Sequence, residues 1–206
     1  MTHSLHRLGS VKDLEDDFTI IFISARGYNN VGSQDKLKKF LELSMKHNAV
    51  NFGNMEAGSL FEHEPATIID AVKDGTTVQA TFASEDDFFN IVKDLVEHDL
   101  GMSVVIQGLS DKVNECCQHA GVEPHTWNHS LGVLGKTELL PPEHVMEITT
   151  MCGHGMVAAS LVEHVIEEIK KGRMSIDQGV KVVASPCLCG FINPVRVKRL
   201  LERVCA

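Results

Sequence analysis

The sequence lacks any apolar run that approaches the roughly 20 residues needed to cross a bilayer. It also lacks a secretion signal, because no apolar segment follows the polar and basic residues at positions 1–10. We therefore expect a soluble protein that stays in the cytoplasm. No Pro-rich or low-complexity tract is present, and 206 residues with 43% apolar composition suffice for one main core.

The chain also lacks an excess of basic residues, because its formal net charge is -9. Nucleic-acid binding requires a basic face that displaces counterions from phosphates, so we exclude nucleic acid as a partner. The basic residues 196–199 fall on a predicted C-terminal helix, where we expect a solvated face near the negative end of the helix dipole. His3, His6 and Arg7 form a polar N-terminal arm that we expect to be mobile, with covering a site or binding an anion as the alternatives.

The first two thirds of the chain contain a strand, helix, strand pattern twice. Residues 18–24 are a β-branched apolar run typical of a buried strand, a helix capped by Ser33 follows, and a second strand is expected near residues 49–52. Residues 76–82 and 102–107 are strands on either side of another helix. The pattern predicts an α/β or α+β fold, a layered sheet with packed helices, either as an open sandwich or in a ferredoxin-like arrangement.

The final third of the chain changes character, because after a weak strand signal at residues 131–134 no strand pattern remains. Three helix signals follow, over residues 156–171, 175–184 and 194–204. We therefore expect an α/β domain with βαβ-type units over residues 1–140. Residues 141–206 are predicted to form a helical region that carries the cysteine motifs and packs on that domain.

Six cysteines in a cytoplasmic chain indicate metal ligation or thiol chemistry, because cytosolic thiols are kept reduced. Cys152 precedes one predicted helix, and Cys187 and Cys189 precede another. The expected helix after Cys152 carries the chain away from it, and the next helix and a short extended segment can bring the chain back. Cys187 and Cys189 can therefore lie close to Cys152. Helix N-termini carry unpaired N–H groups and partial positive charge, which suit thiolates or an anionic cluster. Gathered thiolates repel one another unless a metal neutralises them.

The favoured interpretation is an iron–sulfur protein in which Cys152, Cys187 and Cys189 hold a [4Fe-4S] cluster. Three thiolates leave one iron open, which is typical of a redox or Lewis-acid enzyme, an oxidoreductase or a lyase; an assembly factor is equally compatible. The expected partner is a small-molecule substrate or a redox protein. The alternative is zinc, either catalytic or in a non-catalytic module that docks on a partner. The fourth ligand is left open between His154, the 116–117 cysteine pair and an exchangeable group.

A metal-free alternative also stays open. Residues 151–155 (MCGHG) resemble the segment around a catalytic cysteine in proline racemases, cofactor-independent enzymes that use two opposed cysteines as acid and base. The resemblance covers five residues, and a second family-like cysteine motif is absent. It implies that Cys152 is one acid/base and that Cys187 or Cys189 is the other. Thiol-redox chemistry is a related possibility, and in the plainest alternative the cysteines pack as small apolar residues.

Two further residues are candidates for catalysis. His154, close to Cys152, can serve as ligand, proton donor or thiolate partner. Arg26 follows the first strand, where α/β folds place ligand contacts, although its glycine-containing turn matches no dinucleotide or phosphate-binding fingerprint. Weaker candidates are His125, His129 and Arg196, of which Arg196 is expected to be exposed to solvent.

Overall fold

The computed structural model describes residues 7–206, so His3 and His6 lie outside the described residues. Five strands form one sheet: β1 (Phe18–Ile23), β2 (Asn51–Asn54), β3 (Gly58–Ser59), β4 (Val78–Phe82) and β5 (Ser103–Gln107). Their order is β3-β2-β4-β1-β5, and all neighbouring strands are antiparallel. The mixed α/β class is confirmed, and β2, β4, β1 and β5 have the ferredoxin-like order.

One face of the sheet packs against helices α2 (Gln34–Lys46) and α4 (Glu85–His98). Alternate residues of β1 point to this face, because side chains in a strand alternate between its two sides. Phe18 stacks on Phe88 with ring centroids 4.3 Å apart, and Phe22 stacks on Phe40 at 4.8 Å. This apolar layer is the first of two cores.

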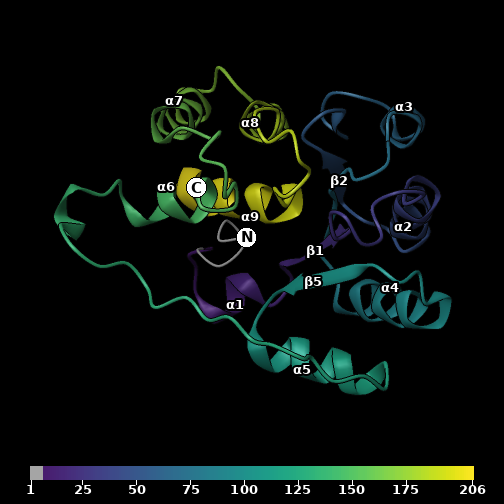
Figure 1. Cartoon of the computed structure of the whole chain (residues 1–206). Coiled ribbons are helices and arrows are strands. Elements are labelled where there is room, and N and C mark those ends of the chain that lie inside the picture. Colours follow the sequence, from purple (N-terminus) through teal and green to yellow (C-terminus); the bar gives the residue numbers. More distant parts are fainter. Residues whose placement is uncertain (1–6) are drawn as a thin grey trace.

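The opposite face of the sheet is covered by the C-terminal helices (Figure 1). They are α6 (Glu143–Thr149), α7 (Ala159–Lys170), α8 (Ile176–Ala184) and α9 (Pro194–Cys205). Ile21 of β1 belongs to the second core with the apolar residues of these helices. The predicted C-terminal helical unit is therefore present, with α6 as a helix that the sequence patterns did not indicate.

Capping residues predicted from the sequence mark the N-termini of two C-terminal helices. Ser175 and Gln178 form the predicted capping box at the start of α8. Asn193 caps α9 by accepting the backbone N–H of Arg196, and Pro194 occupies the first turn. The remaining helices are α1 (Val11–Leu14), α3 (Pro65–Asp70), α5 (Ser110–His119) and the 3₁₀ helix η1 (Thr137–Leu139).

The predicted strand at residues 131–134 is wrong. These residues are irregular, and Leu131 and Leu134 are 88% and 81% exposed. The segment pairs with none of the five strands described above, so no neighbouring strand satisfies an extended backbone there. Gly132 and Gly135 also adopt positive φ angles, which interrupt extended geometry.

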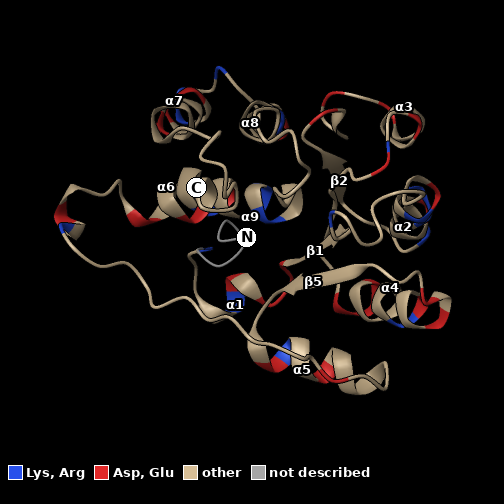
Figure 2. Ribbon diagram, in the orientation of Figure 1, with Lys and Arg blue, Asp and Glu red and all other residues tan. Residues whose placement is uncertain are grey.

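Charged residues of both signs are interspersed along the outer helices, for example on α2 and α4 (Figure 2). None of the helices in residues 7–206 combines the length and apolarity required to traverse a lipid bilayer.

Candidate functional site

Two loops from different helix pairs bring the predicted site residues together. Cys152 lies between α6 and α7, and Cys187 and Cys189 lie between α8 and α9. The Sγ atoms of Cys187 and Cys189 are 3.9 Å apart, and Cys189 Sγ is 3.6 Å from Nδ1 of His154, although 35 residues separate the latter two in sequence. Cys152 in turn interacts with the thiol of Cys187. We call these four residues the cysteine cluster.

The three cysteines of the cluster are at most 3% exposed, whereas His154 is exposed to solvent. Each sulfur also receives backbone N–H donors. Those of His154 and Met156 point to Cys152, that of Ile192 to Cys187, and that of Phe191 to Cys189. The loops that follow the cysteines therefore present N–H groups to sulfur, as expected for loops that precede helices.

The loop that carries Cys187 and Cys189 is docked on polar residues of the sheet. Thr81 Oγ1 donates to the carbonyl of Gly190 at 2.9 Å, and Asn51 Nδ2 donates to the carbonyl of Ile192 at 3.1 Å. With its amide oriented to satisfy its neighbours, Gln79 donates to the carbonyl of Cys189 at 2.8 Å. These side chains project from the face of the sheet that the C-terminal helices cover. They donate hydrogen bonds to buried carbonyl groups that would otherwise be unpaired.

The pKa values of the three thiols differ because of their mutual hydrogen bonds. The pKa of Cys189 is lowered, because the Cys187 thiol and a backbone N–H donate to it, and these donors outweigh the effect of burial. The Cys152 thiol donates to Cys187, but the bond to Cys189 and burial together raise the pKa of Cys187 to about 12. The pKa of Cys152 is raised by its bond to Cys187 and by burial. Among the three thiols, the surroundings of Cys189 favour the thiolate most.

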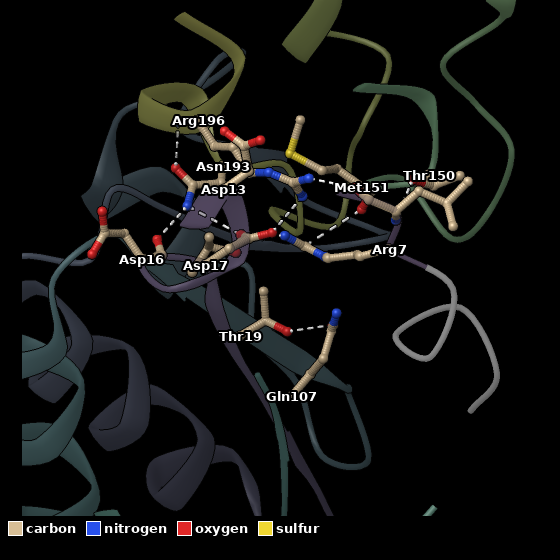
Figure 3. A network of polar contacts seen from close by, with 12 residues as sticks. Arg7, Asp13, Asp16, Asp17, Thr19, Gln107, Thr150, Met151, Asn193 and Arg196 are labelled. Atoms are coloured by element: carbon tan, nitrogen blue, oxygen red, sulfur yellow. Dashed lines mark hydrogen bonds and ion pairs between the residues drawn. The ribbon is translucent and has the colours of Figure 1, made fainter. Parts of the chain in front are cut away.

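A buried charge network lies beside the cluster (Figure 3). The carboxylate of Asp17 is paired with Arg7 and, at 2.8 Å, with Nη1 of Arg196, and it accepts from Asn193 Nδ2 at 3.1 Å. Burial alone would raise the pKa of Asp17, but the charges of Arg7 and Arg196 lower it overall. Asp17 is shared by two guanidinium groups, while the neighbouring carboxylates Asp13 and Glu147, which are also buried, pair with Arg203.

Two sequence expectations are wrong at this point. Arg7 is not mobile but buried, and it donates to Asp17 and to the carbonyl of Phe191. Arg196 is only 1% exposed instead of solvated. Both side chains turn inward because the buried carboxylate of Asp17 requires positive partners, and this requirement is invisible in a local pattern.

The other candidates lie apart from the cluster. Arg26 is exposed in the turn after β1 and lines a surface pocket that contains none of the four cluster residues. His125 and His129 are exposed, and His129 stacks on Trp127. Cys116 is buried in the first core and does not join the cluster. Asp17, Asn51 and Thr81 were missed by sequence reasoning, although a polar residue inside or beside a buried strand was the available signal.

The thiols contact one another in series, from Cys152 to Cys187 to Cys189. Over residues 7–206 no three His, Cys, Asp or Glu side chains are arranged around a position for a metal ion. No family model, curated protein or solved structure matches this chain.

Proposed function

We propose that the protein is a cytoplasmic metalloprotein whose cysteine cluster binds a metal centre, with a [4Fe-4S] cluster held by Cys152, Cys187 and Cys189 as the first candidate. The observation that carries the proposal is the contact of three buried thiols from two separate loops. Cysteines that merely fill an apolar core need neither a polar partner nor N–H donors. Here every sulfur has such donors, and His154 adds a fourth possible ligand.

Charge also supports a bound anionic centre. A [4Fe-4S] cluster with its thiolate ligands carries negative charge. Hydrogen bonds to its sulfur atoms shift its reduction potential. The guanidinium group of Arg7, which contacts the backbone beside both cysteine loops, is a buried positive group close to that negative charge.

Zinc is the second candidate, and two distances favour it. A tetrahedral ion with Zn–S of about 2.3 Å and Zn–N of about 2.05 Å separates two sulfurs by about 3.8 Å, and sulfur from nitrogen by about 3.6 Å. The Cys187 to Cys189 and Cys189 to His154 separations are 3.9 Å and 3.6 Å. A Cys3His zinc site also requires Cys152 and a matching separation between Cys187 and His154, so side chains among the described residues would have to move to surround the ion.

A metal-free thiol enzyme is the third candidate. The thiol of Cys189, with its lowered pKa, would be the reactive group, and Cys187 or Cys152 its acid or redox partner. Access disfavours this candidate, because the three cysteines are buried and line neither the surface pocket beside Arg203 nor the one beside Arg26.

An iron–sulfur centre here would act in electron transfer or as a Lewis acid at an open iron, in an oxidoreductase, a lyase or an assembly factor. Its partner would be a small-molecule substrate or a redox protein. The experiment is anaerobic purification and reconstitution with iron and sulfide, followed by visible and EPR spectra and by iron, sulfide and zinc analysis. About four irons and four sulfides per chain support the first candidate, and one zinc supports the second.

Cys152→Ser is the test variant, and Cys205→Ser is its matched control. Cys205 lies at the end of α9, outside the cluster and half-buried. Metal binding should be lost in Cys152→Ser and retained in Cys205→Ser. A protein that stays colourless and metal-free after reconstitution and zinc loading would contradict both metal candidates and leave thiol chemistry.

A further inference from the structure

The two cysteine loops belong to separate helix pairs, yet one side chain touches both. Arg7 Nη2 donates to the carbonyl of Phe191, two residues after Cys189, and lies 3.5 Å from the carbonyl of Met151, one residue before Cys152. The neighbouring backbone strengthens this link, because the N–H of Leu8 donates to Thr150 Oγ1 at 3.0 Å. Figure 3 shows Arg7 between Asp17 and Met151.

We propose that Arg7 is a positioning residue that holds the two cysteine loops together and supplies positive charge to the centre they form. This inference rests on the proposed metal function, and it extends that function to a residue that is not a ligand. Arg7 acts through the backbone beside the cysteines, at the carbonyls of Met151 and Phe191.

Arg7 is itself held in place from the sheet and from α9. Its guanidinium pairs with Asp17, just before β1, and Asp17 is fixed by Arg196 and Asn193. Asn193 also caps α9, so the carboxylate, the helix start and the cysteine loop share one hydrogen-bonded frame. A group anchored in this way holds the two loops at a fixed separation.

The chemistry of the guanidinium suits this role. Its planar fork carries five N–H donors, so it can pair with a carboxylate on one side and with carbonyl groups on the other. A lysine ammonium is a compact charge and cannot reach the same set of acceptors. Arg7→Lys therefore keeps the charge next to Asp17 but loses the link between the loops.

A second variant separates charge from geometry. In Arg7→Gln, Asp17 remains paired with Arg196 at 2.8 Å, so its buried carboxylate keeps a positive partner. This variant loses both the link and the positive charge of Arg7. The matched control is Arg199→Lys on α9, whose guanidinium pairs with Asp16 at 3.2 Å and contacts neither cysteine loop.

The test that does not depend on metal is the alkylation of each cysteine by iodoacetamide in reduced, metal-free protein, followed by mass spectrometry. We expect Cys152 and Cys189 to react about tenfold faster or more in both Arg7 variants, because a hydrogen-bonded charged contact is lost. Cys116, buried in the other core, should stay protected and so reports that the fold is intact. Arg199→Lys should behave as wild type.

The metal-dependent arm measures the loaded protein. Both Arg7 variants should release their metal to a chelator about tenfold faster than wild type or more. If the centre is an iron–sulfur cluster, its midpoint potential should be lower in Arg7→Gln than in Arg7→Lys, because only the glutamine variant removes the positive charge. Wild-type alkylation and release rates in both variants would overturn the inference. If wild type binds no metal, the proposed function fails while the alkylation rates still decide the role of Arg7.

Discussion

Gly190 lies directly against the backbone of Phe52. A Cβ atom at position 190 would be 2.4 Å from the carbonyl carbon of Phe52 and 2.6 Å from the nitrogen of Gly53. Gly190 also has a φ of +82°, which other residues rarely adopt. The cysteine loop therefore reaches the sheet only because glycine follows Cys189.

Gly190→Ala should lower the free energy of unfolding by about 3 kcal/mol or more, because the loop must both leave the sheet and accept a strained φ. Gly172→Ala is the control, since Gly172 has a similar φ of +69° and a Cβ atom added there would meet no atom within 4 Å. It should cost about 1 kcal/mol. Urea unfolding measures both, and equal losses would show that Gly190 is not packed as described.

Asp17→Asn should destabilise the protein by about 3–5 kcal/mol, because it leaves the buried charges of Arg7 and Arg196 without a partner. The adjacent Asp16 provides the control, because its side chain is 50% exposed and pairs with Arg199 at 3.2 Å. Asp16→Asn should cost less than about 1 kcal/mol. Denaturant unfolding of both variants at pH 7 checks the prediction, which fails if the two losses are alike.

Acid should weaken the fold through Asp17. Its pKa is lower in the folded protein than the ordinary value of 3.8, so the folded state favours the carboxylate. The resulting stability is present above pH 3.8 and is lost as the pH falls through the lower folded pKa. Between pH 5 and pH 2, the free energy of unfolding should therefore fall less with decreasing pH in Asp17→Asn than in Asp16→Asn. Denaturant unfolding at a series of pH values measures this dependence.

Alkali should weaken the metal-free fold through the buried thiols. The pKa of Cys187 is raised from 9.0 to about 12, so the folded state favours its neutral form. That stability is complete below pH 9 and declines as the pH rises toward 12, by about 1.4 kcal/mol per pH unit for one thiol. Cys187→Ala should reduce the slope measured between pH 9 and pH 10.5 by this amount. An unchanged slope would contradict the buried, hydrogen-bonded state of Cys187.

His154→Ala separates the two metal candidates. If His154 is a zinc ligand, its loss should weaken zinc binding by more than about 100-fold, because even residues behind the ligands contribute about 10–100-fold. If three cysteines hold a [4Fe-4S] cluster, the iron content should stay near four per chain and only the spectrum should change. Competition with a chromophoric chelator and iron analysis make the two measurements.

The sequence by itself determined the elements whose cause is local. A continuous β-branched apolar run predicted β1, because such a run is typical of a strand that is buried on both faces. Ser175 and Gln178 predicted the start of α8 through a capping box that spans four positions. The placement of cysteines before helices also followed from such signals, and helix lengths allowed their two loops to meet.

Only the tertiary structure decided which distant groups are partners. Arg7 and Arg196 turn inward because both pair with Asp17, and residues 131–134 are irregular and pair with none of the five described strands. The strand order and the contact between Cys189 and His154 likewise depend on pairing between segments that are distant in the sequence. Pairing free energies of this kind depend on burial and on separations between remote segments, and no local pattern in the sequence records either quantity.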